Sequence, residues 1–126
     1  MFQLCIDHLD LWAMGEPAPR GEPIAVDGEP PVARRDEHGN TIGGLRTTFV
    51  DVPRARYFTC QEQMTGVMEP FPAHELRSLY GDHAGYVAAV EARAAELVAE
   101  RWLLRANADE QVATAASPEV AALFDA

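Results

Sequence analysis

Lysine is absent from this sequence of 126 residues, in which all ten basic residues are arginine. No lysine of the chain can therefore form a Schiff base or hold a phosphate in a P-loop. Cysteine is scarce too: Cys5 and Cys60 are too few, without a C-x-x-C spacing, for a disulfide scaffold or a cysteine-rich zinc site. We expect two buried free thiols, because free cysteine is among the most buried residue types. One disulfide between them is the open alternative.

Positive charge and long apolar runs are also lacking. Ten arginines oppose 20 acidic residues, so the net charge is −10, whereas nucleic-acid binding needs a dense basic surface. No apolar run approaches the roughly 20 residues that a membrane-spanning helix needs. The start of the chain meets Asp7 and Asp10 early and has no positive segment, unlike a signal peptide. We therefore expect one region over 1–126, without nucleic-acid or membrane partners and cytoplasmic by default.

Serine is represented only by Ser78 and Ser117. A G-x-S-x-G nucleophile elbow places its serine on a strained strand-to-helix turn between small residues. Ser78 lies within a predicted helix, and Ser117 precedes a proline as a predicted helix cap. Cys60 would need a lowered pKa to act as a nucleophile, and nearby arginines in the sequence do not establish such a contact. We expect no catalytic residue in this chain.

Metal-ligating patterns are incomplete as well. The H-E-x-x-H pattern of zinc proteases starts at His74 but has Ser78 in place of the second histidine. His74, Asp82 and His83 could converge across the bend at Gly81. Surface and capping roles are the stronger expectation for them, so we expect neither a metal nor a cofactor.

The first 15 residues predict a helix. Gly15 suits the position after its last turn, and Pro17 prevents continuation. His8 falls on the polar side, where we expect it to be solvated. The apolar residues recur at helical spacing, namely Phe2, Cys5, Ile6, Leu9 and Trp12.

Residues 16–60 read as loop with short strands. A strand is expected at 24–26 between several prolines and glycines. The β-branched and apolar segment 45–52 predicts a second strand, and 56–60 a third, which together form a small β element around 45–60.

Residues 73–124 predict a helical region. Asp82 and Ser117 are placed to cap helices, the latter followed by proline and an acidic residue. The clearest helix carries an apolar stripe of Val87, Val90, Ala94, Leu97 and Val98. The expected helices span 73–80, 83–102, 109–116 and 118–124. The fold class is thus α+β and mostly helical.

One loop stands out by its glycines. A turn over 36–40, in which we expect His38 to be solvated, leads into Asn40, Gly43, Gly44 and Arg46. In the first interpretation it is a tight turn feeding a strand, with Arg46 in an ion pair. In the second it borders a ligand pocket, where backbone amides and Arg46 hold an anion.

The run from Arg35 to Pro53 resembles the C-terminal part of a large bacterial α/β-hydrolase domain family. That family shows D-x-x-G-N-x-x-G-G-[IVL]-R followed by V-x-V-P, matched here by DEHGNTIGGLR and VDVP. The resemblance runs from about Leu9 to Phe124. Its other matching segments are Leu9-Asp10-Leu11-Trp12 with Gly15, Pro17 and Pro19, Pro70-Phe71 before Leu76, Leu79 and Tyr80, and Tyr86-Val87.

The resemblance implies a fragment of a larger hydrolase of the ester or amide class. The family's serine nucleophile and acid–base partners belong to a core upstream of this region, and none of them matches a residue here. The chain alone is then inactive, and a completing hydrolase core is its expected partner. The alternative is a non-catalytic interaction module that self-associates, or binds another protein, through the apolar N-terminal helix.

Overall fold

The computed structural model describes residues 2–60 and 65–125. It is an α+β fold, mostly helical, with two antiparallel sheets of two strands each, as predicted. The elements are, in chain order, α1 (Phe2–Ala13), β1 (Val26–Asp27), β2 (Val32–Ala33), α2 (Thr48–Asp51), β3 (Ala55–Cys60), β4 (Thr65–Pro70), α3 (Ala73–Tyr80), α4 (His83–Ala99), α5 (Arg105–Ala115), α6 (Pro118–Ala121) and the 3₁₀ helix η1 (Ala122–Phe124).

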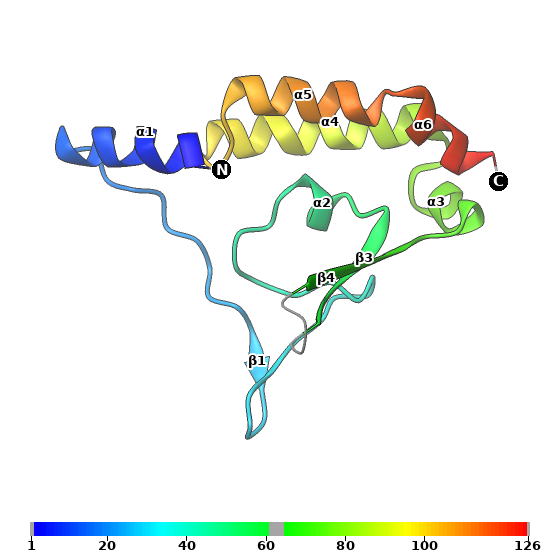
Figure 1. Cartoon of the computed structure of the whole chain (residues 1–126), viewed down its shortest axis with the longest axis horizontal. Helices are drawn as coiled ribbons and strands as arrows, with labels where there is room; N and C mark the ends of the chain where they lie inside the picture. Colours follow the sequence, from blue (N-terminus) through cyan, green and yellow to red (C-terminus); the bar gives the residue numbers. More distant parts are fainter. Residues whose placement is uncertain (1, 61–64, 126) are drawn as a thin grey trace.

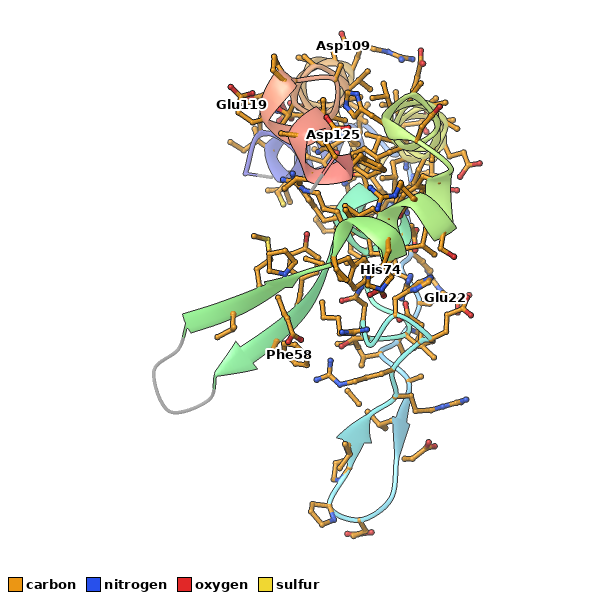
Figure 2. All side chains as sticks on the ribbon, turned by 90° about the vertical axis from the view of Figure 1, so that its right-hand side faces the viewer. Glu22, Phe58, His74, Asp109, Glu119 and Asp125 are labelled. Atoms are coloured by element: carbon orange, nitrogen blue, oxygen red, sulfur yellow. The ribbon has the colours of Figure 1, made fainter. Side chains whose placement is uncertain are left out.

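The helices α4 and α5 lie side by side and form the main layer (Figure 1). The helix α1 extends beyond one end of this layer, and α2 and the two hairpins lie on one side of it. Figure 2 shows both hairpins projecting away from the helices. No helix within residues 2–60 and 65–125 is long and apolar enough to cross a bilayer.

Two predicted helix starts in the C-terminal half, those of α4 and α6, are confirmed by their caps. The Asp82 carboxylate accepts a hydrogen bond from the Gly85 N–H at 2.8 Å and opens α4. The Ser117 hydroxyl accepts one from the Val120 N–H at 3.4 Å and opens α6. Each cap provides a side-chain acceptor for an N–H of the first helical turn, which explains why these starts could be predicted from the sequence.

The end of α4 differs from the prediction. The helix stops at Ala99 instead of 102, because Arg101 adopts a left-handed φ of +64°. The Trp102 N–H then bonds to the Leu97 carbonyl at 2.7 Å, which closes the last turn. No glycine marks this stop, and α5 begins at Arg105, four residues before its predicted start at 109.

One apolar core joins the helices to the segment around the second hairpin. Leu76 of α3 is 1% exposed, and the stripe residues Val90, Ala94 and Leu97 of α4 are buried as predicted. The core cluster consists of Val52, Phe71, Leu76, Tyr86, Val90, Ala115, Val120 and Phe124.

The predicted strand at 45–52 is wrong, because this segment contains the short helix α2. Thr48 and Val52 are both buried and share one helical face, and the Val52 N–H bonds to the Thr48 carbonyl at 2.9 Å. Phe49 between them remains exposed. The strand tendency of β-branched residues depends on context, and here burial follows the helical spacing.

The β element is instead the hairpin of β3 and β4, in which Tyr57 pairs with Met68 and Phe58 with Val67. The strand predicted at 56–60 is confirmed, whereas its partner β4 was not predicted. The strand expected at 24–26 is displaced: β1 starts at Val26 and pairs with β2.

The helix α1, Phe2–Ala13, confirms the helix predicted within residues 1–15, and it ends at the predicted glycine stop. Gly15 has a φ of +95°, and the Glu16 N–H bonds to the Leu11 carbonyl at 2.9 Å, the arrangement of a Schellman motif. The predicted burial of Cys5 is wrong, because α1 packs little of its surface and leaves this thiol exposed. The side chain of Cys60 lies outside the described part of the chain.

Candidate functional site

The turn over 36–40 is held by an aspartate. One carboxylate oxygen of Asp36 accepts hydrogen bonds from the backbone N–H groups of His38, at 3.0 Å, and Asn40, at 2.8 Å. The expectation that His38 is solvated is wrong: its side chain is 24% exposed, and its ring lies 6.2 Å from that of Phe71. The turn thus packs on the core.

Asn40, which is 2% exposed, links this turn to strand β3 of the β3–β4 hairpin. Its side-chain N–H donates to the Ala55 carbonyl at 3.4 Å, and its side-chain oxygen accepts from the Tyr57 N–H at 3.1 Å. Both polar ends of the buried amide therefore have a partner, as buried polar groups generally require.

The glycine pair of the loop approaches the backbone of the preceding segment. Gly43 has a φ of +82°, and a Cβ there would lie 2.1 Å from the Pro23 carbonyl oxygen. The Gly44 N–H bonds to the Glu22 carbonyl at 2.8 Å. Close approach of two chain segments accounts for this glycine pair.

Arg46 bridges two carboxylates, in agreement with the ion-pair interpretation. Its guanidinium lies 2.9 Å from the Asp36 carboxylate and 2.5 Å from that of Asp51, and donates to the Thr41 carbonyl at 2.6 Å. Burial alone would raise the pKa of Asp36, but the hydrogen bonds from Arg46 and two backbone N–H groups bring that pKa below its usual value. The guanidinium donors toward the turn and α2 are thus already engaged.

The second oxygen of Asp51 continues this network into the helical layer. Arg93 of α4 lies 2.8 Å from it and also donates to Glu96 at 2.9 Å. Because Asp51 is shared by Arg46 and Arg93, the glycine loop, α2 and α4 form one connected unit.

A cavity of about 580 Å³ lies beside the loop, and Asn40, Gly43, Gly44 and Arg46 all line it. The hairpin of β3 and β4 forms the opposite wall. The apolar or aromatic lining residues are Ile24, Leu45, Val50, Tyr57, Phe58, Val67 and Met68. The structure therefore places the four loop residues along one cavity. Most polar groups that line it already make hydrogen bonds within the protein.

The serines and histidines considered for chemistry are dispersed. Ser78 is exposed on α3, and His74 is exposed on the same helix. His83 places its Nε2 atom 2.8 Å from the Ala115 carbonyl, while Asp82 caps α4. Within residues 2–60 and 65–125, no three acidic, histidine or cysteine side chains form a group suited to a metal.

His8 contradicts its predicted solvation. Its ring packs edge-on against Trp102 with 6.4 Å between ring centroids, and its Nε2 atom is buried without a hydrogen-bond partner in the described residues. The return of the chain after α4 toward α1 produces this contact, which helix periodicity alone does not reveal.

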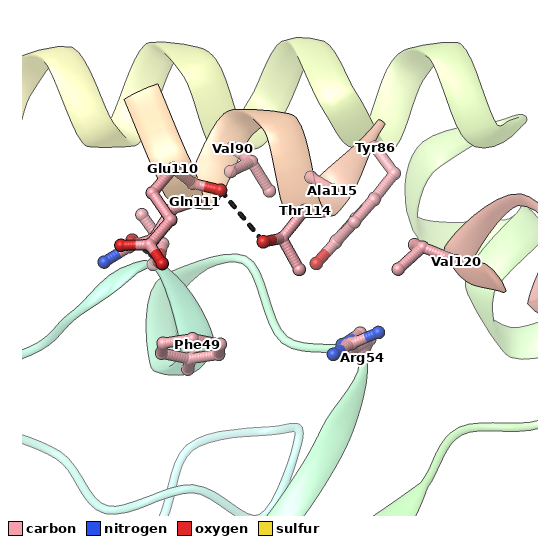
Figure 3. A pocket seen from close by; sticks show the side chains of 10 residues that line it. Phe49, Arg54, Tyr86, Val90, Glu110, Gln111, Thr114, Ala115 and Val120 are labelled. Atoms are coloured by element: carbon pink, nitrogen blue, oxygen red, sulfur yellow. Dashed lines mark hydrogen bonds between the residues drawn. The ribbon is translucent and has the colours of Figure 1, made fainter. Parts of the chain in front are cut away.

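A second cavity, of about 290 Å³, was not predicted from the sequence (Figure 3). It lies between the segment around α2 and the helices α4, α5 and α6. Arg54 and Tyr86 meet here although they are far apart in the sequence and belong to no motif, so no spacing signal could have found them. Its other lining residues are Thr48, Phe49, Val90, Glu110, Gln111, Thr114, Ala115 and Val120.

Comparison with known proteins agrees with the resemblance carried by the glycine loop. The alpha/beta hydrolase domain family matches residues 1–113. The chain belongs to this family and is hydrolase-like. No curated protein and no solved structure matches it significantly.

Proposed function

We propose that this chain is the C-terminal part of a hydrolase domain of the ester or amide class, and that it provides framework and a pocket wall but no catalytic nucleophile. The observation that carries the proposal is the family match over residues 1–113 of a chain whose two serines lie outside any nucleophile elbow.

The strand-to-helix turns support this assignment. Within the described ranges, the one short connection from a strand to a helix joins β4 to α3. It carries Phe71, which is buried, and Pro72, which is exposed, with no serine or cysteine. An α/β-hydrolase needs its nucleophile on such a turn, so the reactive serine of the domain would belong to another part of it.

Exposed apolar surface also supports a missing partner. Val67 and Met68 on β4 are 52% and 53% exposed, on a hairpin that projects from the helices (Figure 2). Exposed apolar surface of this kind commonly marks a site of association. In this proposal a completing hydrolase core covers the hairpin and the cavity beside Arg46.

The test is an esterase assay of the purified chain with p-nitrophenyl acetate. We expect a slow background rate that is the same for the wild type and for the Ser78→Ala and Cys60→Ala variants. Saturable turnover abolished by either substitution would refute the framework role.

The DNA upstream of the Met1 codon gives an independent test. We expect an open reading frame that encodes a G-x-S-x-G elbow, in the same frame or in an adjacent gene. The absence of such an elbow from the neighbouring frames would contradict a completing core.

The exposed face of α1 favours a second candidate, a non-catalytic module that self-associates. Ile6, Leu9 and Trp12 are 52%, 60% and 66% exposed. Sedimentation of the chain discriminates the two: a stable dimer that Leu9→Asp dissociates and Asp10→Ala leaves intact supports the module. Nonspecific aggregation of both variants supports the fragment.

A further inference from the structure

The cavity shown in Figure 3 combines an apolar wall with two unused hydrogen-bond donors. Its volume of about 290 Å³ lies near the lower end of the roughly 300–1,000 Å³ of small-molecule pockets. The apolar wall consists of Phe49, Val90, Ala115 and Val120. A ligand that fits must therefore be small and largely apolar.

Arg54 is the first unused donor. It is half-buried and makes no ion pair or side-chain hydrogen bond with any residue in 2–60 or 65–125. The other arginines without such a partner, Arg20 and Arg105, are exposed to water. A guanidinium has five N–H donors and always carries its charge. Partial burial without a counter-charge thus leaves Arg54 ready for an anion.

Tyr86 is the second donor. It is 6% exposed, and its ring packs 5.1 Å from Tyr80 and 5.9 Å from Phe124. Its hydroxyl points into the cavity on the side of Arg54 (Figure 3) and has no hydrogen-bond partner in the described part of the chain. Burial raises the pKa of this hydroxyl, partly offset by Arg54, so it remains a proton donor at neutral pH.

The remaining polar groups limit the charge that the cavity accepts. Thr114 donates its hydroxyl to the Glu110 carbonyl at 2.9 Å, and Gln111 accepts from Thr48 at 2.5 Å. The Glu110 carboxylate lies at the opposite end from Arg54 (Figure 3). A second negative charge on a ligand would meet this carboxylate, which disfavours dianions.

We propose that this cavity binds a small monocarboxylate with an apolar body. The carboxylate accepts hydrogen bonds from the Arg54 guanidinium and the Tyr86 hydroxyl, the kind of charge-assisted contact that Arg makes with planar anions. The apolar body packs on the wall formed by Phe49, Val90 and Val120. All these groups belong to this chain, so the inference does not depend on a completing hydrolase core.

The experiment is calorimetric titration of the full chain with benzoate at neutral pH. We expect saturable binding of one benzoate per chain. Arg54→Met should weaken it about tenfold or more, since hydrogen bonds to charged groups carry that much energy, and Tyr86→Phe should weaken it less. The control Arg105→Met removes an exposed arginine elsewhere and should bind benzoate as the wild type does.

The ligand series tests the charge preference on the unaltered chain. Benzamide has nearly the same shape without the negative charge and should bind at least about tenfold more weakly than benzoate. If Arg54→Met fails to fold, this series decides the question alone. The proposal is overturned if wild-type chain shows no saturable benzoate binding, if benzamide binds equally well, or if a folded Arg54→Met variant retains wild-type affinity.

Discussion

Replacement of Arg46 by methionine tests whether the carboxylate network holds the glycine loop to the helices. Arg46 contacts Asp36 and Asp51, whose side chains are 19% and 23% exposed. Hydrogen bonds to charged groups contribute about 1.5–3 kcal/mol each. Asp51 keeps its bond to Arg93 at 2.8 Å in the variant, which limits the loss. We therefore expect Arg46→Met to lower the free energy of unfolding by about 2–4 kcal/mol.

Urea unfolding followed by circular dichroism measures this change. With slopes of about 1–3 kcal/mol/M, the midpoint should fall by roughly 1–2 M. Arg46→Lys keeps the positive charge but not the planar guanidinium, so it should lower the free energy of unfolding by an intermediate amount. The control Arg34→Met removes a pair to Asp27 whose members are 55% and 76% exposed, and should change stability by less than about 0.5 kcal/mol. Equal midpoints for Arg46→Met and Arg34→Met would refute the network.

Three further predictions concern the same framework. The pKa of Asp36 is lowered in the folded state. The carboxylate therefore stabilises the fold fully above its unfolded pKa of about 3.9, and this stabilisation is lost as the pH falls further. Unfolding curves recorded at successive pH values should show a smaller loss of stability at acidic pH for Asp36→Asn than for the wild type. Gly43→Ala meets backbone at 2.1 Å, whereas Gly81→Ala has nothing within 4 Å of its Cβ at a similar φ; chemical unfolding should show a cost of about 1–2 kcal/mol for Gly81→Ala and clearly more for Gly43→Ala. Leu76→Ala should lower the free energy of unfolding by about 2–5 kcal/mol in the same assay. Leu79 is 37% exposed, so Leu79→Ala should lower it much less. Similar losses for the two variants would contradict a core centred on Leu76.

The sequence by itself determined those helix boundaries that are fixed by interactions between residues close together in the chain. The helix α3 has its predicted bounds, Ala73–Tyr80, and Asp82 caps α4 as expected. Gly15 ends α1 with a positive φ. In each case the decisive interaction joins residues only a few positions apart, such as a capping hydrogen bond or a left-handed glycine, so it can be read without knowledge of the fold. The glycine loop likewise indicated the family, which the match over residues 1–113 shows.

Long-range packing decided the rest. Thr48 and Val52 became one buried helical face instead of a strand, and Arg101 took the left-handed position that sequence rules reserve for glycine. Arg46 found its counter-charges in Asp36 and Asp51, and the donors of the second cavity came together from segments far apart. Charge pairing, burial and cavities depend on which segments lie next to one another in the folded chain. The spacing of residues along the sequence does not predict these contacts.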